Sequence, residues 1–282
     1  MSSRALVLGA GGVTGVAWHL GMLRGLAAAG VDLTDADLVV GTSAGAFVGA
    51  QITSGAPLED LYTNQLADAR GEPAARLGWP VLAGYAWAML RSRSHLSFRR
   101  RLGAAARRRT AGEGQRRAVI AARLPAHTWP QRPLRITAVD TVTGELVVFD
   151  RDSGVPLVDA VAASCAVPLV WPPVTIDGRR YMDGGMRSAT NADLAAGYER
   201  VVVLAPLPRG AGWLPSVSAH VADLRRGGAQ VVVVSPDAAA RAAIGRNVLA
   251  PARRAAAARA GLAQAAAEAD AVRRVWLGAA AG

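Results

Sequence analysis

Apolar residues along this chain fall into short runs that alternate with helical patterns, and that alternation is typical of an α/β fold. Residues 5–8 and 38–40 are continuous apolar runs, as expected of strands buried on both faces of a sheet. Between these runs, apolar side chains recur at every third or fourth position from Val16 to Ala27. The chain is therefore predicted to begin with a strand, a helix and a second strand, with a glycine-rich turn after each strand.

The rest of the chain continues this alternation. Further strands are predicted at 134–139, 145–149, 201–204 and 231–234, and a hairpin with an Asp-Gly turn at 173–182. Helices are predicted at 46–54, 58–69, 156–164 and 217–226, and residues 237–282 are expected to be helical with a break near 247–251. Because neither a repeat nor a long polar linker interrupts this order, we expect a single domain over residues 1–282, with helices on both faces of a mostly parallel sheet.

The amino-acid composition predicts a large hydrophobic core and a strong positive net charge. Of the 282 residues, 51% are hydrophobic, which allows a substantial core to be buried. All 32 basic residues are arginine against 21 acidic residues, giving a formal net charge of +11. Abundant Ala, Arg, Gly, Pro and Val indicate a GC-rich codon preference, which explains part of this charge. The alternative is attraction to a phosphate-bearing surface, with anionic lipid favoured over nucleic acid.

One segment, at about 71–132, differs in character from the rest and is predicted to be an insertion. Residues 78–90 are uncharged and aromatic-rich, and residues 91–117 contain ten arginines and one acid, Glu113. An apolar aromatic stretch beside basic residues is typical of an element that docks on an anionic membrane surface. A buried helix followed by a solvated basic helix fits the same pattern, so both interpretations stay open.

The cysteine content and the lack of a signal or membrane-spanning segment indicate where the protein is located. A single cysteine, Cys165, excludes an intrachain disulfide and a multi-cysteine metal site. The N-terminal residues enter a strand without the long apolar region of a secretory signal, and no uncharged run approaches the roughly 20 residues that span a bilayer. We expect a cytoplasmic protein, peripheral on the inner membrane face if the basic segment docks there, without a metal or cofactor.

The turn after the second strand carries the first candidate for chemistry. Its sequence is Gly41-Thr42-Ser43-Ala44-Gly45. A serine between small residues at a strand-to-helix turn is what a nucleophile elbow needs, because only such residues allow the sharp turn that presents the hydroxyl. A glycine-rich turn with an incidental serine is the alternative.

The turn after the first strand, residues 9–15, is rich in glycine and can direct several backbone N–H groups at one anion, either a phosphate or a tetrahedral oxyanion. A dinucleotide site requires an acidic residue at the end of the next strand, and that strand ends instead on the Ser43 turn. A mononucleotide loop requires a lysine, which the sequence lacks. A non-catalytic phosphate-binding role nevertheless remains an alternative for this loop.

A candidate base is Asp183, which ends the return strand of the predicted hairpin and precedes two glycines. Ser43, Asp183 and His220 would have the chain order of an α/β-hydrolase triad. Only 42 residues precede Ser43, however, whereas that fold normally places several strands before its elbow. The favoured interpretation is a Ser43–Asp183 dyad in which the carboxylate accepts the hydroxyl proton. His19 is expected to be a packed or surface side chain.

Together these motifs resemble the bacterial patatin-like phospholipases. The matching residues are the loop 9–15, the elbow 41–45, the block Ala163-Ser164-Cys165-Ala166-Val167-Pro168 and the triplet 183–185. The resemblance implies a three-layer α/β/α sandwich, hydrolysis of lipid acyl esters by Ser43 and Asp183, and an oxyanion hole at the glycine loop. The backbone donors would be Gly11, Gly12 and Val13, and the supporting glycines would be Gly41, Gly45, Gly184 and Gly185.

The sequence departs from this family at Thr14, where the oxyanion loop commonly carries arginine or lysine. That loss leaves open how the loop is anchored and how a substrate phosphate is recognised. Two classes of function therefore follow from the sequence: a lipid acyl hydrolase, and a non-catalytic or nucleotide-binding α/β protein in which Ser43 is structural.

Overall fold

The structure is a computed structural model, and it describes residues 3–67, 75, 78–109, 111–208 and 215–278. Residues 71–74, 76–77 and 110 of the predicted insertion, and residues 279–282 of the predicted C-terminal helix, lie outside the described residues.

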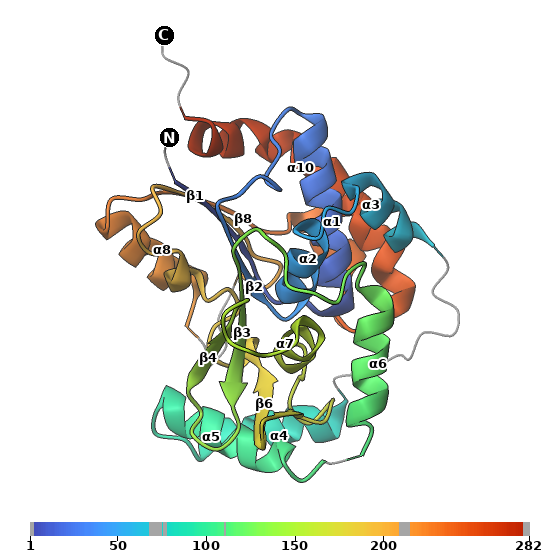
Figure 1. Cartoon of the computed structure of the whole chain (residues 1–282), viewed down its shortest axis with the longest axis vertical. Coiled ribbons are helices and arrows are strands. Elements are labelled where there is room, and N and C mark those ends of the chain that lie inside the picture. The colour runs from blue at the N-terminus through green and yellow to red at the C-terminus, as the bar shows by residue number, and fades with distance from the viewer. Residues whose placement is uncertain (1–2, 68–74, 76–77, 110, 209–214, 279–282) are drawn as a thin grey trace.

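A mixed sheet forms the centre of the molecule (Figure 1). Within the described residues its strand order is β5-β6-β3-β2-β1-β7-β8, and β4 pairs with β3. The five strands from β3 to β8 in this order are parallel, and β4, β5 and β6 add antiparallel pairs at one end. The strands are β1 Arg4–Leu8, β2 Leu38–Thr42, β3 Leu134–Asp140, β4 Leu146–Phe149, β5 Val174–Ile176, β6 Arg179–Asp183, β7 Arg200–Leu204 and β8 Gln230–Val234.

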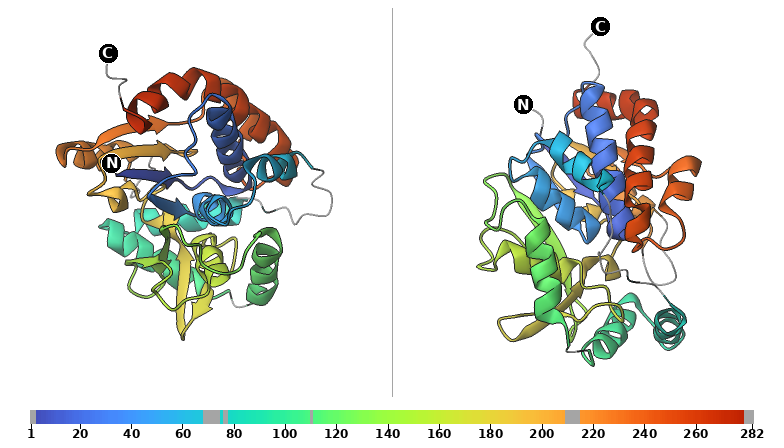
Figure 2. Two further views of the ribbon diagram at one scale, coloured as in Figure 1. Left: turned by 45° about the horizontal axis from the view of Figure 1, so that its top comes forward. Right: turned by 90° about the vertical axis from the view of Figure 1, so that its right-hand side faces the viewer.

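Helices cover both faces of this sheet, as Figure 2 shows from two further directions. The α-helices are α1 Gly12–Ala28, α2 Ala44–Ile52, α3 Leu58–Leu66, α4 Trp79–Leu90, α5 His95–Ala106, α6 Glu113–Arg123, α7 Leu157–Ser164, α8 Val217–Arg226, α9 Ala238–Ile244 and α10 Arg254–Trp276. Short 3-10 helices are η1 Gly184–Met186, η2 Ala192–Ala195 and η3 Pro251–Arg253. The predicted three-layer α/β/α architecture with a mostly parallel sheet is confirmed.

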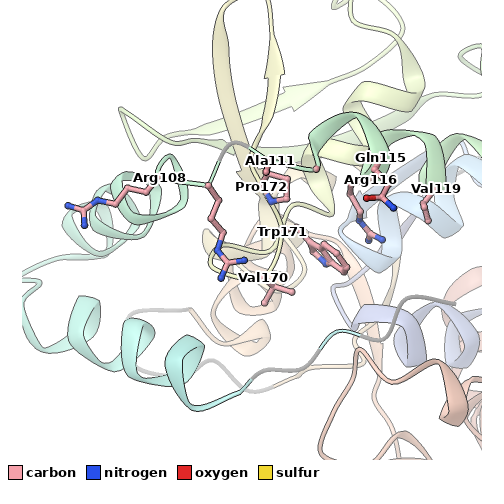
Figure 3. A pocket seen from close by; sticks show the side chains of 10 residues that line it. Arg108, Ala111, Gln115, Arg116, Val119, Val170, Trp171 and Pro172 are labelled. Carbon is pink, nitrogen blue, oxygen red and sulfur yellow. The ribbon is translucent and has the colours of Figure 1, made fainter.

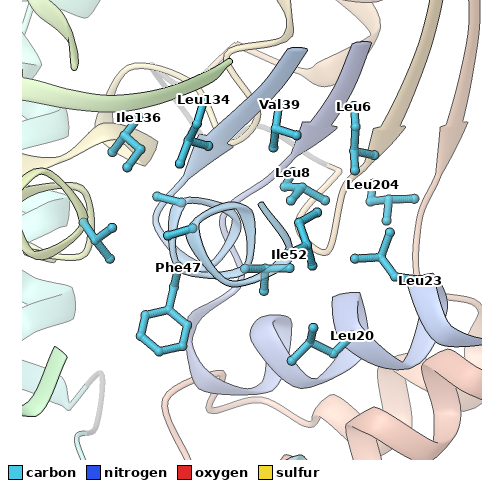
Figure 4. Packing of buried hydrophobic residues seen from close by; sticks show 14 of the residues in the cluster. Leu6, Leu8, Leu20, Leu23, Val39, Phe47, Ile52, Leu134, Ile136 and Leu204 are labelled. Atoms are coloured by element: carbon cyan, nitrogen blue, oxygen red, sulfur yellow. The ribbon is translucent and has the colours of Figure 1, made fainter. Parts of the chain in front are cut away.

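The two faces of the sheet belong to different hydrophobic clusters because side chains alternate along each strand. Leu6 and Leu8 of β1 point toward α1, α2 and α10, and Figure 4 shows this packing with Val39 and Leu204 from the neighbouring strands. Ala5 and Val7 point to the opposite face, which is covered by α8 and η2. The central strands are therefore buried on both sides, as their uninterrupted apolar sequence predicts.

The predicted insertion forms helices α4, α5 and α6 at the antiparallel end of the sheet, far from the start of β1 (Figure 1). Helices α4 and α5 bury Ala88, Phe98 and Leu102 against Val139 and Met182 of β3 and β6. No helix within the described ranges is long and apolar enough to cross a bilayer.

Helix α4 is apolar on its outer face. Its Trp79 is 84% exposed and its Leu90 is 86% exposed, and only Val81 and Ala88 of this helix are buried. The alternative of a buried helix for residues 78–90 is therefore wrong. Only one face of a helix can pack against the core. Because α4 is apolar on all sides, its other face exposes apolar side chains.

Most predicted elements occur close to their predicted bounds. The hairpin of β5 and β6 turns at Asp177-Gly178, and the C-terminal helical region is interrupted between α9 and α10. Helix α3 ends at Leu66, because Ala67 is already extended, and residues 68–69 of the predicted helix lie outside the described residues. The strand at 134–139 extends by one residue to Asp140.

Candidate active site

Ser43 lies in a strained turn between β2 and α2. Its φ of 53° and ψ of −113° are unusual for a residue with a side chain, and such a backbone costs about 1–3 kcal/mol. Gly45 allows α2 to start against β1, because a Cβ at that position would overlap the carbonyl oxygen of Leu8. The Ser43 amide donates a hydrogen bond to Ser164 Oγ at 2.9 Å, and the Cys165 thiol donates to the Ser43 carbonyl oxygen at 3.3 Å. Strand, helix and loop together hold the turn.

Asp183 ends β6 and lies near Ser43. Its carboxylate accepts a hydrogen bond from the Gly185 amide at 2.7 Å, and the Ser43 side chain is close enough to lower the pKa of this carboxyl. Gly184 permits a close approach of this turn to β3, because a Cβ there would overlap Thr137 Oγ1. Burial raises the pKa of Asp183 to about 6, and the nearby Ser43 side chain and the hydrogen bond from the Gly185 amide oppose this shift. The two predicted catalytic residues therefore lie near each other in the fold, although 139 residues separate them in the chain.

The histidines occupy other parts of the fold. His220 Nδ1 lies 3.3 Å from Asp193 Oδ1, and Asp193 is also held by Arg187 in a two-point ion pair with distances of 2.6 and 2.7 Å. Burial lowers the pKa of His220 and the Asp193 carboxylate opposes that shift. His19 is fully buried, with Nε2 3.3 Å from the carbonyl oxygen of Leu204. The structure thus pairs His220 with Asp193, and the triad arrangement with Asp183 has no support in these contacts.

The glycine loop supplies unpartnered amides at the start of α1. Thr14 and Gly15 donate their amides to the carbonyl oxygens of Val248 and Gly11, at 3.1 and 2.8 Å. Within the described residues, the amides of Gly11, Gly12 and Val13 have no backbone acceptor. Free N–H groups at a helix start favour negative charge.

A cavity of about 50 Å³ connects these groups. Ser43 and the loop residues Gly12 and Val13 line it, whereas Gly11 and Asp183 do not. Its other lining residues come from α1, α2, α6 and two further segments: Val16, Ala44, Phe47, Arg116, Ile120, Arg123, Cys165, Val167, Trp171 and Leu249. The loop and the elbow therefore face one small, mostly apolar space.

A buried polar network behind Ser43 was not predicted from the sequence. Thr42 Oγ1 and Thr137 Oγ1 are 2.9 Å apart, and Asn191 Nδ2 donates to Thr42 Oγ1 at 3.0 Å. Asn191 also donates to the carbonyl oxygen of Ser188 at 2.9 Å. These bonds connect the elbow strand β2 to β3 and to the segment after Asp183. Thr42 belongs to the elbow motif, but Asn191 stands in no motif that would have identified it.

The larger part of this chain matches a known protein family. Residues 6–196 match the family described as patatin-like phospholipase, and this range contains the glycine loop, Ser43 and Asp183. The chain belongs to the patatin-like phospholipase family. The membership supports lipid acyl hydrolysis as the general class of activity, and the chain is a hydrolase of lipid esters in this broad sense.

Solved structures that are similar to this chain have low sequence identity to it. VipD from Legionella pneumophila has a TM-score of 0.48 and 13% identity, with 96% of this patatin-like chain and 67% of VipD covered. The type III effector ExoU has a TM-score of 0.42 and 17% identity, with 96% of this chain and 53% of ExoU covered. A structure of SpcU in complex with ExoU from Pseudomonas aeruginosa has a TM-score of 0.34 and 20% identity, with 84% of this chain and 48% of that chain covered. This chain thus spans about half the length of ExoU.

In this patatin-like chain, Thr14 anchors the glycine loop without a positive charge. Its Oγ1 donates to the carbonyl oxygen of Val248 at 3.2 Å, and its amide donates to the same oxygen at 3.1 Å. The segment between α9 and α10 therefore holds the loop in place. Thr14 thus anchors the loop by hydrogen bonds to Val248, and it provides no positive charge that could bind a substrate phosphate.

Proposed function

We propose that this protein hydrolyses carboxylic esters of lipids with Ser43 as the nucleophile and Asp183 as the general base. The observation that carries the proposal is the position of Ser43, in its strained turn, near the buried Asp183 carboxylate and beside a loop with free amides. Labelling with a fluorophosphonate probe tests it, because only an activated serine reacts with this probe. Modification at Ser43 supports the proposal, and an unlabelled folded protein contradicts it.

In the acylation step, Ser43 Oγ attacks the ester carbonyl carbon while its proton passes to Asp183. The carbonyl oxygen becomes an oxyanion, which the amides of Gly12 and Val13, and that of Gly11 at the loop, would stabilise by hydrogen bonds. When the intermediate collapses, the carbon–oxygen bond to the alcohol breaks and Asp183 returns the proton to the leaving alkoxide. An acyl ester of Ser43 remains.

In the deacylation step, water attacks the acyl carbon and gives a proton to Asp183. The bond to Ser43 Oγ then breaks, the fatty acid leaves, and Ser43 regains the proton from Asp183. One carboxylate serves both steps, so no histidine is needed. The pKa of Asp183, raised to about 6 by burial, makes it a stronger base than an exposed aspartate while it is still ionised near neutral pH.

The alternative of a phosphate-binding protein without catalysis is less well supported. Gly12 and Val13 line the same cavity as Ser43, so the loop with the free amides lies beside the candidate nucleophile. A nucleotide site would leave the strained Ser43 backbone and the buried Asp183 without a role.

The pH dependence of the reaction follows from the raised pKa of Asp183. Since the base acts in its ionised form, kcat/KM should fall as the pH drops through about 6. At pH 5, we expect kcat/KM for a p-nitrophenyl ester to be about tenfold lower than at pH 8. Initial rates between pH 5 and 8 measure this limb, and circular dichroism at each pH shows that the fold persists. A profile that stays flat down to pH 5 would contradict the assignment.

We further propose that the outer face of α4 docks on an anionic lipid surface. Trp79, Leu82, Trp87 and Leu90 are 84%, 49%, 52% and 86% exposed, and together they form an apolar strip next to the arginines of α5. On its inner side, α4 packs near Leu169, in the loop that also carries Trp171 of the Ser43 cavity. Docking through this strip would bring the lipid surface close to that cavity.

A paired substitution tests the docking surface. The double variant Trp79→Ala, Leu90→Ala should bind phosphatidylglycerol vesicles more weakly than the parent chain by about a hundredfold or more. Each large apolar side chain contributes about 1.5–3 kcal/mol on burial, and about 1.4 kcal/mol corresponds to a factor of ten in affinity. Vesicle sedimentation at low and high salt measures binding, and high salt should weaken it. Leu277→Ala, at a leucine that is 52% exposed elsewhere, is the matched control. Equal binding to phosphatidylcholine at all salts, or binding to duplex DNA instead, would refute the docking proposal.

A further inference from the structure

A second, larger cavity adjoins the cavity of Ser43. Its volume is about 460 Å³, and it lies between α6 and the loop that includes Val170, Trp171 and Pro172 (Figure 3). Arg116 and Trp171 line both cavities, so this pair forms the partition between them. In Figure 3 the guanidinium of Arg116 lies beside the indole of Trp171, and the two are 4.2 Å apart from Cζ to ring centroid.

Helix α6 is fixed in a way that directs Arg116 to this partition. The Glu113 carboxylate accepts a hydrogen bond from the Thr175 amide at 2.6 Å, which ties the start of the helix to β5. Arg117 donates to Asp159 Oδ2 of α7 at 2.6 Å, and Ile120 is buried in the main core. These contacts set the rotation of the helix about its axis, and Arg116 consequently faces the cavities.

Among the residues that the structure describes, no carboxylate forms an ion pair with Arg116. Its Nε atom is buried and lacks a hydrogen-bond partner within the described residues, and no acidic side chain is among the residues that line either cavity. Arg123, one and a half to two turns further along α6, also lines the Ser43 cavity and adds a second positive charge. Arg116 is only partly exposed, and removing part of a guanidinium from water without an anion beside it costs free energy that a bound anion would offset.

We propose that Arg116 binds the phosphate group of an anionic glycerophospholipid while the acyl ester of the same molecule lies at Ser43. This inference rests on the proposed function and names its substrate class. A guanidinium presents a planar set of N–H donors that matches the oxygens of a phosphate, and stacking on Trp171 keeps that plane in one orientation. The larger cavity offers room for the headgroup, because it begins on the other side of the partition.

The assignment also accounts for the uncharged residue in the glycine loop. Thr14 is buried and bonded to Val248, so it provides no cation at the cavity. The positive charge at the cavity is provided instead by Arg116 of α6, a helix far from the glycine loop in the sequence. In Figure 3, Arg108 points away from Trp171, whereas Arg116 lies beside it. Arg109 also lines the larger cavity, but Arg116 is the arginine that lines both cavities.

The test compares two substrates that differ only in the phosphate: 1-oleoyl-lysophosphatidic acid and 1-oleoylglycerol. In Arg116→Gln, the ratio of kcat/KM for the phosphate-bearing ester to that for the neutral ester should fall about tenfold, which is the loss expected for a charge-assisted hydrogen bond. Arg116→Lys keeps the charge without the planar fork and should give an intermediate ratio. Arg259→Gln removes the same charge from an exposed site on α10 and should leave the ratio unchanged. A ratio in Arg116→Gln equal to that of the parent would overturn the proposal.

A binding measurement separates this proposal from the hydrolase proposal. An alkyl ether analogue of lysophosphatidic acid has no ester to cleave, and calorimetry reads its affinity whether or not the protein is an enzyme. About tenfold weaker binding by Arg116→Gln supports the site even if the parent chain hydrolyses neither ester, and equal binding refutes it even if Ser43 is reactive. Competition by inorganic phosphate distinguishes the two sources of this group: displacement at equal concentration indicates a site for free phosphate, which contradicts a lipid substrate.

Discussion

Substitution of Ser43 by alanine should lower ester hydrolysis by about 10⁴-fold, because the proposed reaction passes through an acyl ester of this hydroxyl. The side chain packs no core, and alanine fits the small turn, so the fold should be kept. Hydrolysis of a p-nitrophenyl ester and fluorophosphonate labelling measure the effect, and both should be lost together.

The control for this variant is a serine far from the cavity. Ser218 is exposed on α8, on the opposite face of the sheet, and Ser218→Ala should retain the parent rate. Far-UV circular dichroism of both variants should match that of the parent. If Ser43→Ala folded normally and still hydrolysed the ester at the parent rate, Ser43 would not be the nucleophile.

Substitution of Asp183 by asparagine should lower kcat/KM by about 10³-fold, since an amide cannot accept the hydroxyl proton and general-base catalysis typically contributes about 10²–10⁴-fold. Asparagine has nearly the same shape and can still accept the hydrogen bond from Gly185. The acid limb of the pH profile, which reflects ionisation of Asp183, should disappear from the residual activity. Steady-state kinetics between pH 5 and 8 provide both measurements.

His220→Ala is the comparison that separates a dyad from a triad. His220 contacts Asp193 and does not line the Ser43 cavity, so this variant should keep activity close to that of the parent. A greater loss in His220→Ala than in Asp183→Asn would favour a triad and reject the proposed dyad.

Asp183→Asn should also stabilise the protein at neutral and higher pH. The pKa of Asp183 is raised from 3.8 to about 6, so the unfolded chain releases its proton more readily than the folded one, and stability is lost as the pH rises between these values. Asparagine avoids this loss, which amounts to about 3 kcal/mol at most. Chemical denaturation should show little difference between variant and parent at pH 4 and the largest difference above pH 7. A variant less stable than the parent at pH 8 would show that the carboxylate is needed for the fold.

The sequence alone determined the elements and the chemistry that lies at their ends. Apolar runs such as 5–8 and 38–40 favour strands buried on both faces of a sheet, because they are too short for a helix and a glycine-rich turn follows each of them. Ser43 and Asp183 were identifiable because a sharp turn and a close approach both require glycine neighbours, and this requirement is visible locally. The prediction of one domain over residues 1–282 stays a prediction.

Other features depended on which segments meet in space. Asn191 reaches Thr42 and Thr137 because β3 pairs with both β2 and β6, an order that no local pattern encodes. The arginine-rich residues looked alike in sequence, yet they have different partners: Arg117 pairs with Asp159, whereas Arg116 stacks on Trp171 between two cavities. Composition could not separate these neighbours, because the partner of a long charged side chain is set by the rotation of its helix against the rest of the fold. The sequence thus determined which groups could react, and the tertiary structure decided which charges face them.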